Sequence, residues 1–350
     1  MEFSEEYYHA SHPVVVSLSD LRSGASDDKL PLAFGPNSLG IVLVSGMPEE
    51  YVRLRESVLL SASRLAHLPQ DVLASMEVPQ AQWLVGWSRG REKLEGSGDK
   101  PDTQKGSFYV NCAFHTCDDL EAPPSADVKG YEKGYEIYTH SNVWPPEDLE
   151  FKRNLKDLCN LMIDTAAVVA AACDRLFGGK LPGYEKGHLE HIVSTSTTTK
   201  ARLLHYFPSK PDEDIDPEEG STWCGEHTDH SCITALTAAM YFDDSLYPLV
   251  HEIQEQFPGS GLHVRNRRGE TVHVKIPPDC LAFQTGSALE ETTSGRFKAV
   301  PHRVARGKLP AGVCRNTLAV FCQPALGAPV GPRYSDFATF ARSVVERNHQ

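Results

Sequence analysis

The residues of this chain that are best suited to chemistry lie in the segment Cys224-Gly-Glu-His-Thr-Asp-His230. If His227 and Asp229 lie on a strand or at its end, their side chains point to the same side, because strand side chains alternate between faces. An imidazole and a carboxylate would then converge, and a second imidazole would complete the facial ligand set of a non-haem iron(II) site. His-x-Asp is a short pattern, however, and a turn or a hydrogen-bonded pair is the alternative interpretation.

A histidine that could complete this set is His302, in the centre of the β-like run 297–304. Further along, Arg315 precedes the apolar run 318–321, and Thr317 lies two residues later on the same strand face. A guanidinium presents a fork of donors that matches a carboxylate. The pattern therefore predicts a metal site with an anion-binding position beside it, although a surface ion pair of Arg315 is also compatible.

Two other metal sites are conceivable. Cys224 and Cys232 bracket the His-x-Asp motif, but a zinc site there lacks a second CxxC or HxxxH pair, so small buried thiols are the preferred interpretation. His263 and His273 could serve a cupin-type site, or be partly exposed strand residues on either side of the Arg-rich turn.

The predicted secondary structure that positions these residues differs between the first and second parts of the chain. Residues 1–12 are predicted to be a flexible N-terminus, and residues 13–200 to hold strands at 12–18 and 40–46, a helix at 48–66 and a long helix from Trp144 to Phe177. From 201 to 350, short β-type runs alternate with turns, which favours a sandwich or barrel. The predicted runs are 201–206, 233–237, 261–264, 271–276, 280–284, 297–304 and 316–321. We expect one globular unit, mainly β with flanking helices, in which 13–200 pack on a catalytic core at 201–350.

Composition restricts the possible partners. The formal net charge is -13, so a polyanion is repelled on average and no nucleic-acid partner is expected. No apolar run is long enough for a membrane span, and the first residues lack the pattern of a secretory signal. The nine cysteines include no CxxC pair, which favours free thiols in a reducing compartment. We therefore expect a cytoplasmic protein, and we further expect a monomer or weak oligomer.

Six motifs occur in an order that resembles the 2-oxoglutarate and iron(II)-dependent oxygenases, specifically the branch of isopenicillin N synthase and the plant flavonoid and hormone dioxygenases. The motifs are Arg202–Pro208, His227-Thr-Asp229, Gly261–Val264, Gly295–Phe297, Pro301–Val304 and Arg315-Asn-Thr317. Each motif alone is weak evidence, and the resemblance rests on all six occurring in the order that is typical of the family.

This resemblance implies a distorted double-stranded β-helix, or jelly roll, with Fe(II) bound by His227, Asp229 and His302. It also implies that Arg315 and Thr317 hold the C5 carboxylate of 2-oxoglutarate, and that O2 takes the remaining position. Oxidative decarboxylation of 2-oxoglutarate would be coupled to hydroxylation or desaturation of a small molecule. Three alternatives stay open: an isopenicillin N synthase-like oxidase without 2-oxoglutarate, a non-oxidative cupin-like metalloprotein, and a binding protein that has lost catalysis.

One departure from the family pattern concerns the segment Leu204–Pro208. The plant relatives usually have Asn where His205 stands and Tyr where Phe207 stands, so a hydroxyl near the co-substrate is missing. We predict that His205 supplies the replacement hydrogen bond, the alternative being a strand histidine bonded to a nearby backbone carbonyl. The irregular aromatic segment 83–115, including Tyr109 and Asn111, is predicted to determine substrate choice.

Overall fold

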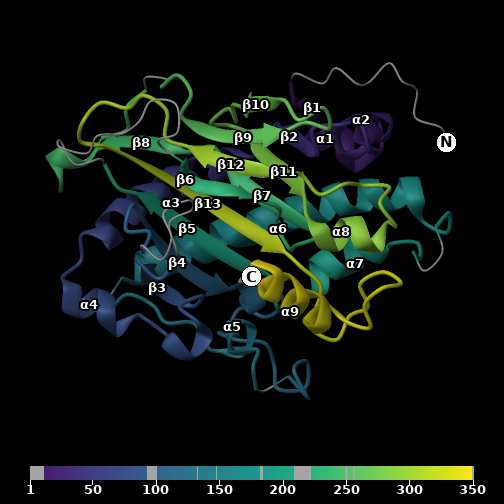
Figure 1. Ribbon diagram of the computed structural model, residues 1–350, viewed down its shortest axis with the longest axis horizontal. Helices are drawn as coiled ribbons and strands as arrows, with labels where there is room; N and C mark the ends of the chain where they lie inside the picture. Colours follow the sequence, from purple (N-terminus) through teal and green to yellow (C-terminus); the bar gives the residue numbers. More distant parts are fainter. Residues whose placement is uncertain are drawn as a thin grey trace.

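Two β-sheets form the centre of the protein in the computed structural model (Figure 1). The structure describes residues 12–92, 101–131, 133–146, 148–181, 184–208, 222–248, 251–254 and 257–348. The predicted flexible N-terminus lies, apart from its last residue, outside these ranges.

The larger sheet has nine strands in the order β1-β2-β11-β7-β13-β5-β4-β3, and β8 also pairs with β13. Its central strand β13 is the longest strand described and pairs with three neighbours along its length. The strands are β1 (Val14–Ser17), β2 (Ile41–Ser45), β3 (Gly86–Arg89), β4 (Lys105–Asn111), β5 (Lys200–Tyr206), β7 (Ile233–Thr237), β8 (Met240–Asp243), β11 (Leu281–Thr285) and β13 (Val313–Cys322).

The smaller sheet has four antiparallel strands in the order β10-β9-β12-β6. They are β6 (Thr222–His227), β9 (Gly261–Arg265), β10 (Thr271–Val274) and β12 (His302–Ala305). Apolar side chains of β9 and β10, such as Leu262 and Val274, pack against Ile41, Leu43 and Ala282 of the larger sheet. The two sheets thus face each other across a shared core, and the predicted jelly roll with flanking helices is confirmed.

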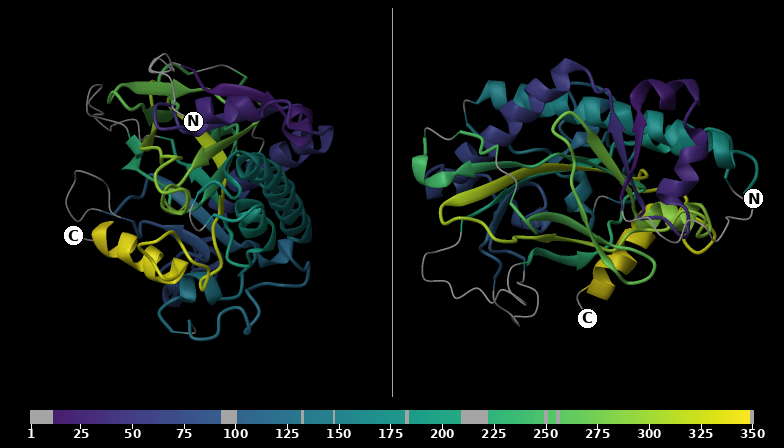
Figure 2. Two further views of the ribbon diagram at one scale, coloured as in Figure 1. Left: turned by 90° about the vertical axis from the view of Figure 1, so that its right-hand side faces the viewer. Right: turned by 90° about the horizontal axis from the view of Figure 1, so that it is seen from above.

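The outer face of the larger sheet is covered by α3 (Glu49–Ala66) and α6 (Leu149–Phe177), which run along it in the view from above (Figure 2). Helix α3 forms because apolar residues recur at helical spacing, and the predicted stripe from Tyr51 to Ala62 is buried. Helix α6 starts after Asp148, whose carboxylate accepts the Phe151 backbone N–H at 2.9 Å. Both helices were predicted, but α6 begins later than Trp144, since a pair of prolines follows that residue.

Other helices are short or lie at the periphery, and several carried no clear sequence pattern. They are α1 (Leu18–Ser23), α2 (Leu30–Phe34), α4 (Gln70–Ser75), α5 (Glu136–Thr139), α7 (His188–Thr195), α8 (Ser287–Thr292) and α9 (Phe337–Asn348). None of the helices in the described ranges is long and apolar enough to cross a bilayer. All nine cysteines are free thiols, as predicted.

Candidate functional site

The two sheets bring His227, Asp229 and His302 together. His227 ends β6 and His302 begins β12, and the two residues are direct register partners in the smaller sheet. Asp229 follows β6 by two residues, and its Oδ1 lies 3.7 Å from His227 Nε2 and 3.8 Å from His302 Nε2. One ligand atom from each of these residues lies within 4.8 Å of the other two. Three electron-pair donors therefore converge on one point, as a metal ion requires.

Backbone carbonyls orient both imidazoles toward this point. His227 Nδ1 lies 2.8 Å from Gly225 O, and His302 Nδ1 lies 3.0 Å from Val300 O. A carbonyl oxygen only accepts, so each Nδ1 carries a proton and donates, which leaves Nε2 as the nitrogen that faces Asp229. This is the usual arrangement behind a histidine ligand, in which a partner of the distal nitrogen determines the tautomer.

The Asp229 carboxylate is held from the larger sheet. Its Oδ2 accepts hydrogen bonds from Thr234 Oγ1 at 2.6 Å and from Gln284 Nε2 at 2.5 Å. Thr234 and Gln284 are register partners on β7 and β11, so one pair of strands supplies both donors. Burial would raise the pKa of Asp229, but electrostatic interaction with His302 and His227 when these are protonated, and the hydrogen bonds from Thr234 and Gln284, hold the pKa below its usual value. Asp229 is therefore ionised, with Oδ1 directed to the histidines.

The turn that carries Asp229 is fixed by the start of α8. The Ser287 backbone N–H donates to Asp229 O at 2.7 Å, and the Gly286 N–H donates to Cys232 O at 3.0 Å. A Cβ on Gly286 would lie 2.1 Å from Ser231 O, so only glycine allows this approach. The ligand turn is thus positioned by contacts distant in sequence.

We predict that Thr234→Val weakens iron(II) affinity by roughly 10–100-fold, the usual effect of losing an outer hydrogen bond to a metal ligand. The variant removes one of the two donors that direct the Asp229 carboxylate. Anaerobic iron(II) titration measures the change. Thr234→Ser keeps the hydroxyl and is the matched control, whereas unchanged affinity in Thr234→Val would show that Gln284 alone orients Asp229.

Arg315 and Thr317 line the same cavity as the three convergent residues, so five of the six predicted site residues share one cavity. Arg315 is only 6% exposed, yet its Nε and Nη1 have no hydrogen-bond partner in the described part of the chain. Its guanidinium carbon lies 5.3 Å from the ring centroid of Tyr206, which stands opposite it on β5. Unpaired buried N–H groups are costly. A carboxylate in the cavity would satisfy them, so the residues present fit that group.

The predicted contact between His205 and the co-substrate has to be corrected. His205 points to the helical side of the larger sheet, where its Nδ1 lies 2.8 Å from Asn316 Oδ1. Side chains alternate along β5, so the neighbouring Tyr206, and not His205 or Phe207, faces the cavity. The sequence analysis missed Tyr206, whose position opposite Arg315 becomes visible only once the strands are paired. Burial raises the pKa of the Tyr206 hydroxyl to about 12, so it stays protonated.

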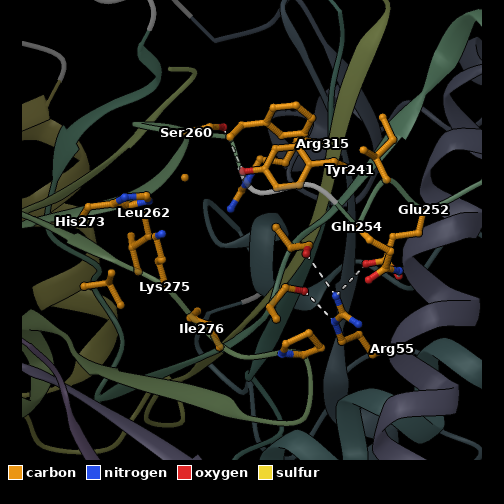
Figure 3. Close-up of a pocket in the computed structure, with 17 residues that line it drawn as sticks. Arg55, Tyr241, Glu252, Gln254, Ser260, Leu262, His273, Lys275, Ile276 and Arg315 are labelled. Atoms are coloured by element: carbon orange, nitrogen blue, oxygen red, sulfur yellow. Dashed lines mark hydrogen bonds and ion pairs between the residues drawn. The ribbon is translucent and has the colours of Figure 1, made fainter. Parts of the chain in front are cut away.

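A second cavity lies on the other side of Arg315 (Figure 3). Arg315 and Leu262 line both cavities. Here Tyr241, the β8 partner of Arg315, bonds to Ser260 with 2.9 Å between their hydroxyl oxygens. Arg55 also lines this cavity, and its Nε donates to Ala238 O at 2.8 Å. Arg315 therefore forms part of the wall between two cavities of the barrel.

Another wall of the first cavity carries an ion-pair network around Arg202. Arg202 Nη2 lies 2.5 Å from Glu92 Oε1 and its Nε donates to Ser107 Oγ at 3.0 Å. Lys105 Nζ pairs with Glu92 Oε2 at 2.8 Å and with Asp102 Oδ2 at 2.9 Å. Two cations and two carboxylates thus meet at the concave face of β4 and β5. This network makes the cavity wall polar at Arg202.

In the aromatic segment predicted to determine substrate choice, some side chains pack in the core and others form polar contacts. Trp87 and Phe108 pack into the core beneath the helices, as does Phe114. Tyr109 donates to Glu92 Oε1 at 3.2 Å, and Asn111 Nδ2 donates to His140 O at 2.8 Å. None of these five side chains lines the cavity of the convergent residues.

The alternative sites do not assemble in the described structure. Cys232 is buried, and Cys224 Sγ lies 3.8 Å from the Nδ1 of His227, which is not the nitrogen that faces Asp229. His263 and His273 stack on each other with ring centroids 4.6 Å apart, on neighbouring strands of the smaller sheet. They form no three-residue ligand cluster within the described ranges.

Comparisons with known proteins agree with this geometry. Residues 198–324 match the 2OG-Fe(II) oxygenase superfamily model. The chain is 25% identical over 235 residues to feruloyl CoA ortho-hydroxylase 2 of Arabidopsis thaliana, which covers 65% of this chain and 54% of the relative. The match thus spans about half the length of that relative.

Solved structures agree in fold. A 2OG-Fe(II) oxygenase family protein from Caulobacter crescentus has a TM-score of 0.68 at 19% identity, covering 95% of this chain and 99% of that one. A full-length Neurospora crassa protein in complex with alpha-KG has a TM-score of 0.66 at 19% identity, covering 92% and 88%. Residues 198–324, which match the 2OG-Fe(II) oxygenase superfamily model, include the three convergent side chains and Arg315.

Proposed function

We propose that this protein is an Fe(II)-dependent oxygenase that couples oxidative decarboxylation of 2-oxoglutarate to hydroxylation or desaturation of a small molecule. One observation carries the proposal: a single cavity holds three convergent metal-ligand atoms and a buried guanidinium with unpaired donors. The first feature suits a metal with open coordination positions, and the second suits a carboxylate.

In this proposal His227, Asp229 and His302 hold the iron, which supplies oxygen activation when bound. Arg315 binds the C5 carboxylate of 2-oxoglutarate, and Thr317, two residues further along β13 on the same face, contacts the same group. Leu262 and Val304 line the cavity and exclude water beside these polar groups. The chain thus binds, orients and desolvates its reactants, while the iron and the co-substrate carry the oxidation.

The relatives support a small-molecule substrate. The Arabidopsis thaliana relative is named as a hydroxylase of feruloyl CoA, and the Neurospora crassa protein was crystallised with alpha-KG. The polar wall formed by Arg202 and its partners offers hydrogen-bonding groups to a polar part of such a substrate. We further propose that the protein works in the cytoplasm as a monomer or weak oligomer, without a nucleic-acid partner.

The test is anaerobic loading with Fe(II) and 2-oxoglutarate, followed by admission of O2 and a screen of small-molecule metabolites. We expect succinate formation that depends on iron and O2 and rises with a turned-over metabolite. Oxygen consumption without succinate would instead favour an isopenicillin N synthase-like oxidase. Turnover with a metal other than iron and without O2 would favour a non-oxidative cupin-like enzyme.

A further inference from the structure

A second cluster of metal-ligand side chains lies behind the larger sheet, on the face opposite the cavity. His205 on β5, Cys314 on β13 and Asp244 in the turn after β8 each offer one ligand atom, and these atoms lie within 4.8 Å of one another. His205 is 1% exposed and Cys314 is fully buried. A fourth residue, His67 at the end of α3, adjoins them, with its Nε2 3.2 Å from Asp244 Oδ2.

The hydrogen bonds around His205 determine its tautomer. Asn316 Nδ2 donates to Leu59 O at 2.7 Å and to Ser63 Oγ at 2.8 Å, which leaves Asn316 Oδ1 to face His205 Nδ1 at 2.8 Å. An amide oxygen only accepts, so Nδ1 carries the proton and Nε2 carries a lone pair. His205 Nε2 is buried and has no hydrogen-bond partner among the described residues.

The side chains of His67 and Asp244 face each other. His67 Nδ1 lies 2.8 Å from Ser63 O, so it donates there, and its Nε2 faces Asp244 Oδ2 at 3.2 Å. Asp244 Oδ1 is buried and has no hydrogen-bond partner in the described structure. Within the cluster, His205 Nε2 and Asp244 Oδ1 are thus two buried acceptor atoms without a hydrogen-bond partner among the described residues. A buried acceptor without a donor is destabilising, and a cation between them would satisfy both.

We propose that His205, Asp244 and Cys314, with His67 as the fourth ligand, form a second metal site that binds Zn²⁺. Thiolate, imidazole and carboxylate are all zinc ligands, and four protein ligands make a closed, structural site. Tetrahedral zinc with bonds of about 2.0–2.3 Å separates its ligand atoms by roughly 3.3–3.8 Å. These separations fall within the 4.8 Å that contains one ligand atom each of His205, Asp244 and Cys314. The thiol also distinguishes it from the oxygen- and nitrogen-only set of His227, Asp229 and His302.

The position of the cluster suggests what this metal does. Cys314 and Asn316 flank Arg315 on β13 and point to the helical side, while Arg315 points into the cavity. The ion would join the end of α3, the end of β5, the turn after β8 and the start of β13. Zinc bound there would therefore hold Arg315 in place from behind. This inference does not depend on the proposed oxygenase activity.

The experiment uses the full chain, purified without a metal-chelating tag, stripped with a chelator and titrated with Co²⁺ as a spectroscopic substitute for zinc. The background is the variant His227→Ala, Asp229→Ala, His302→Ala, which removes the cavity ligands. We expect one equivalent of Co²⁺ to bind, with the near-ultraviolet charge-transfer absorption of a thiolate–cobalt bond, and Zn²⁺ to displace it.

In the same background, Cys314→Ala should abolish the absorption and the bound equivalent. Cys322→Ala is the matched control, because Cys322 is another buried thiol at a same-parity position of β13, and it should bind Co²⁺ normally. Cys224→Ala controls for the thiol beside His227. If Cys314→Ala does not fold, Co²⁺ binding by the folded variant His227→Ala, Asp229→Ala, His302→Ala still tests the proposal. Failure of that variant to bind Co²⁺ with a thiolate band would overturn the proposal.

Discussion

Replacing His302 by alanine is expected to abolish stoichiometric iron(II) binding and oxygen-dependent turnover. The variant removes one of three convergent ligand atoms, so the loss should exceed the roughly 10–100-fold that follows from removing an outer hydrogen bond. Anaerobic iron(II) titration and oxygen uptake measure the two effects. His227→Ala and Asp229→Ala should behave alike.

A matched control is His273→Ala, which removes a histidine of the smaller sheet that belongs to no ligand cluster of the described chain. It should leave iron binding unchanged. Full activity in His302→Ala would refute the ligand assignment. Acidification should also release iron, because both imidazoles and the carboxylate must be deprotonated to bind metal. Burial lowers the pKa of His302, so this histidine is neutral at neutral pH and available to the metal.

Arg315→Leu is expected to raise the KM for 2-oxoglutarate by roughly 10–100-fold, since a hydrogen bond to a charged group contributes about 1.5–3 kcal/mol. The KM for the primary substrate should change less, because the lost donors face the co-substrate. Steady-state kinetics with each reactant varied in turn measures both constants. Arg315→Lys should restore only part of the affinity, because an ammonium lacks the planar fork.

Stability measurements separate binding from a structural role of Arg315. Its Nε and Nη1 are buried without partners in the described structure, so Arg315→Leu should not lower the melting temperature of the protein without 2-oxoglutarate. Stabilisation by added 2-oxoglutarate should disappear in the variant, as expected when a ligand no longer binds the native state. Arg303→Leu, a change on β12, is the control. An unchanged KM together with a lowered melting temperature would assign Arg315 to structure.

Much of the fold could be predicted because local sequence patterns indicate where its strands and helices lie. Turn residues separated short β-type runs from 201 onward, and the stripe on α3 had helical spacing. The start of β12 was less predictable. The sequence predicted a strand at 297–304, but only His302–Ala305 pair with neighbouring strands. The preceding backbone instead follows α8, where the ring of Phe297 packs against the ring of Phe34. Helix α9 was missed, although its buried residues Phe337, Ala341 and Val344 recur at helical spacing.

Five residues of the candidate site could be identified from the amino-acid sequence alone. Motif order and strand alternation were sufficient to predict His227, Asp229, His302, Arg315 and Thr317, because side chains two apart on a strand share a face. Which face of β5 looks into the barrel was not predictable. Nearly every residue of β5 is buried, so its sequence shows no contrast between an inner and an outer side.

How the strands meet was settled by tertiary packing. Strand pairing places His302 opposite His227 and Gln284 opposite Thr234, so that the smaller sheet supplies the imidazoles and the larger sheet orients the carboxylate. Sheet and helix packing also gathers His67, His205, Asp244 and Cys314 behind β13. These contacts join residues far apart in the chain, and no local periodicity encodes them, because they depend on register and on which faces the two layers present to each other.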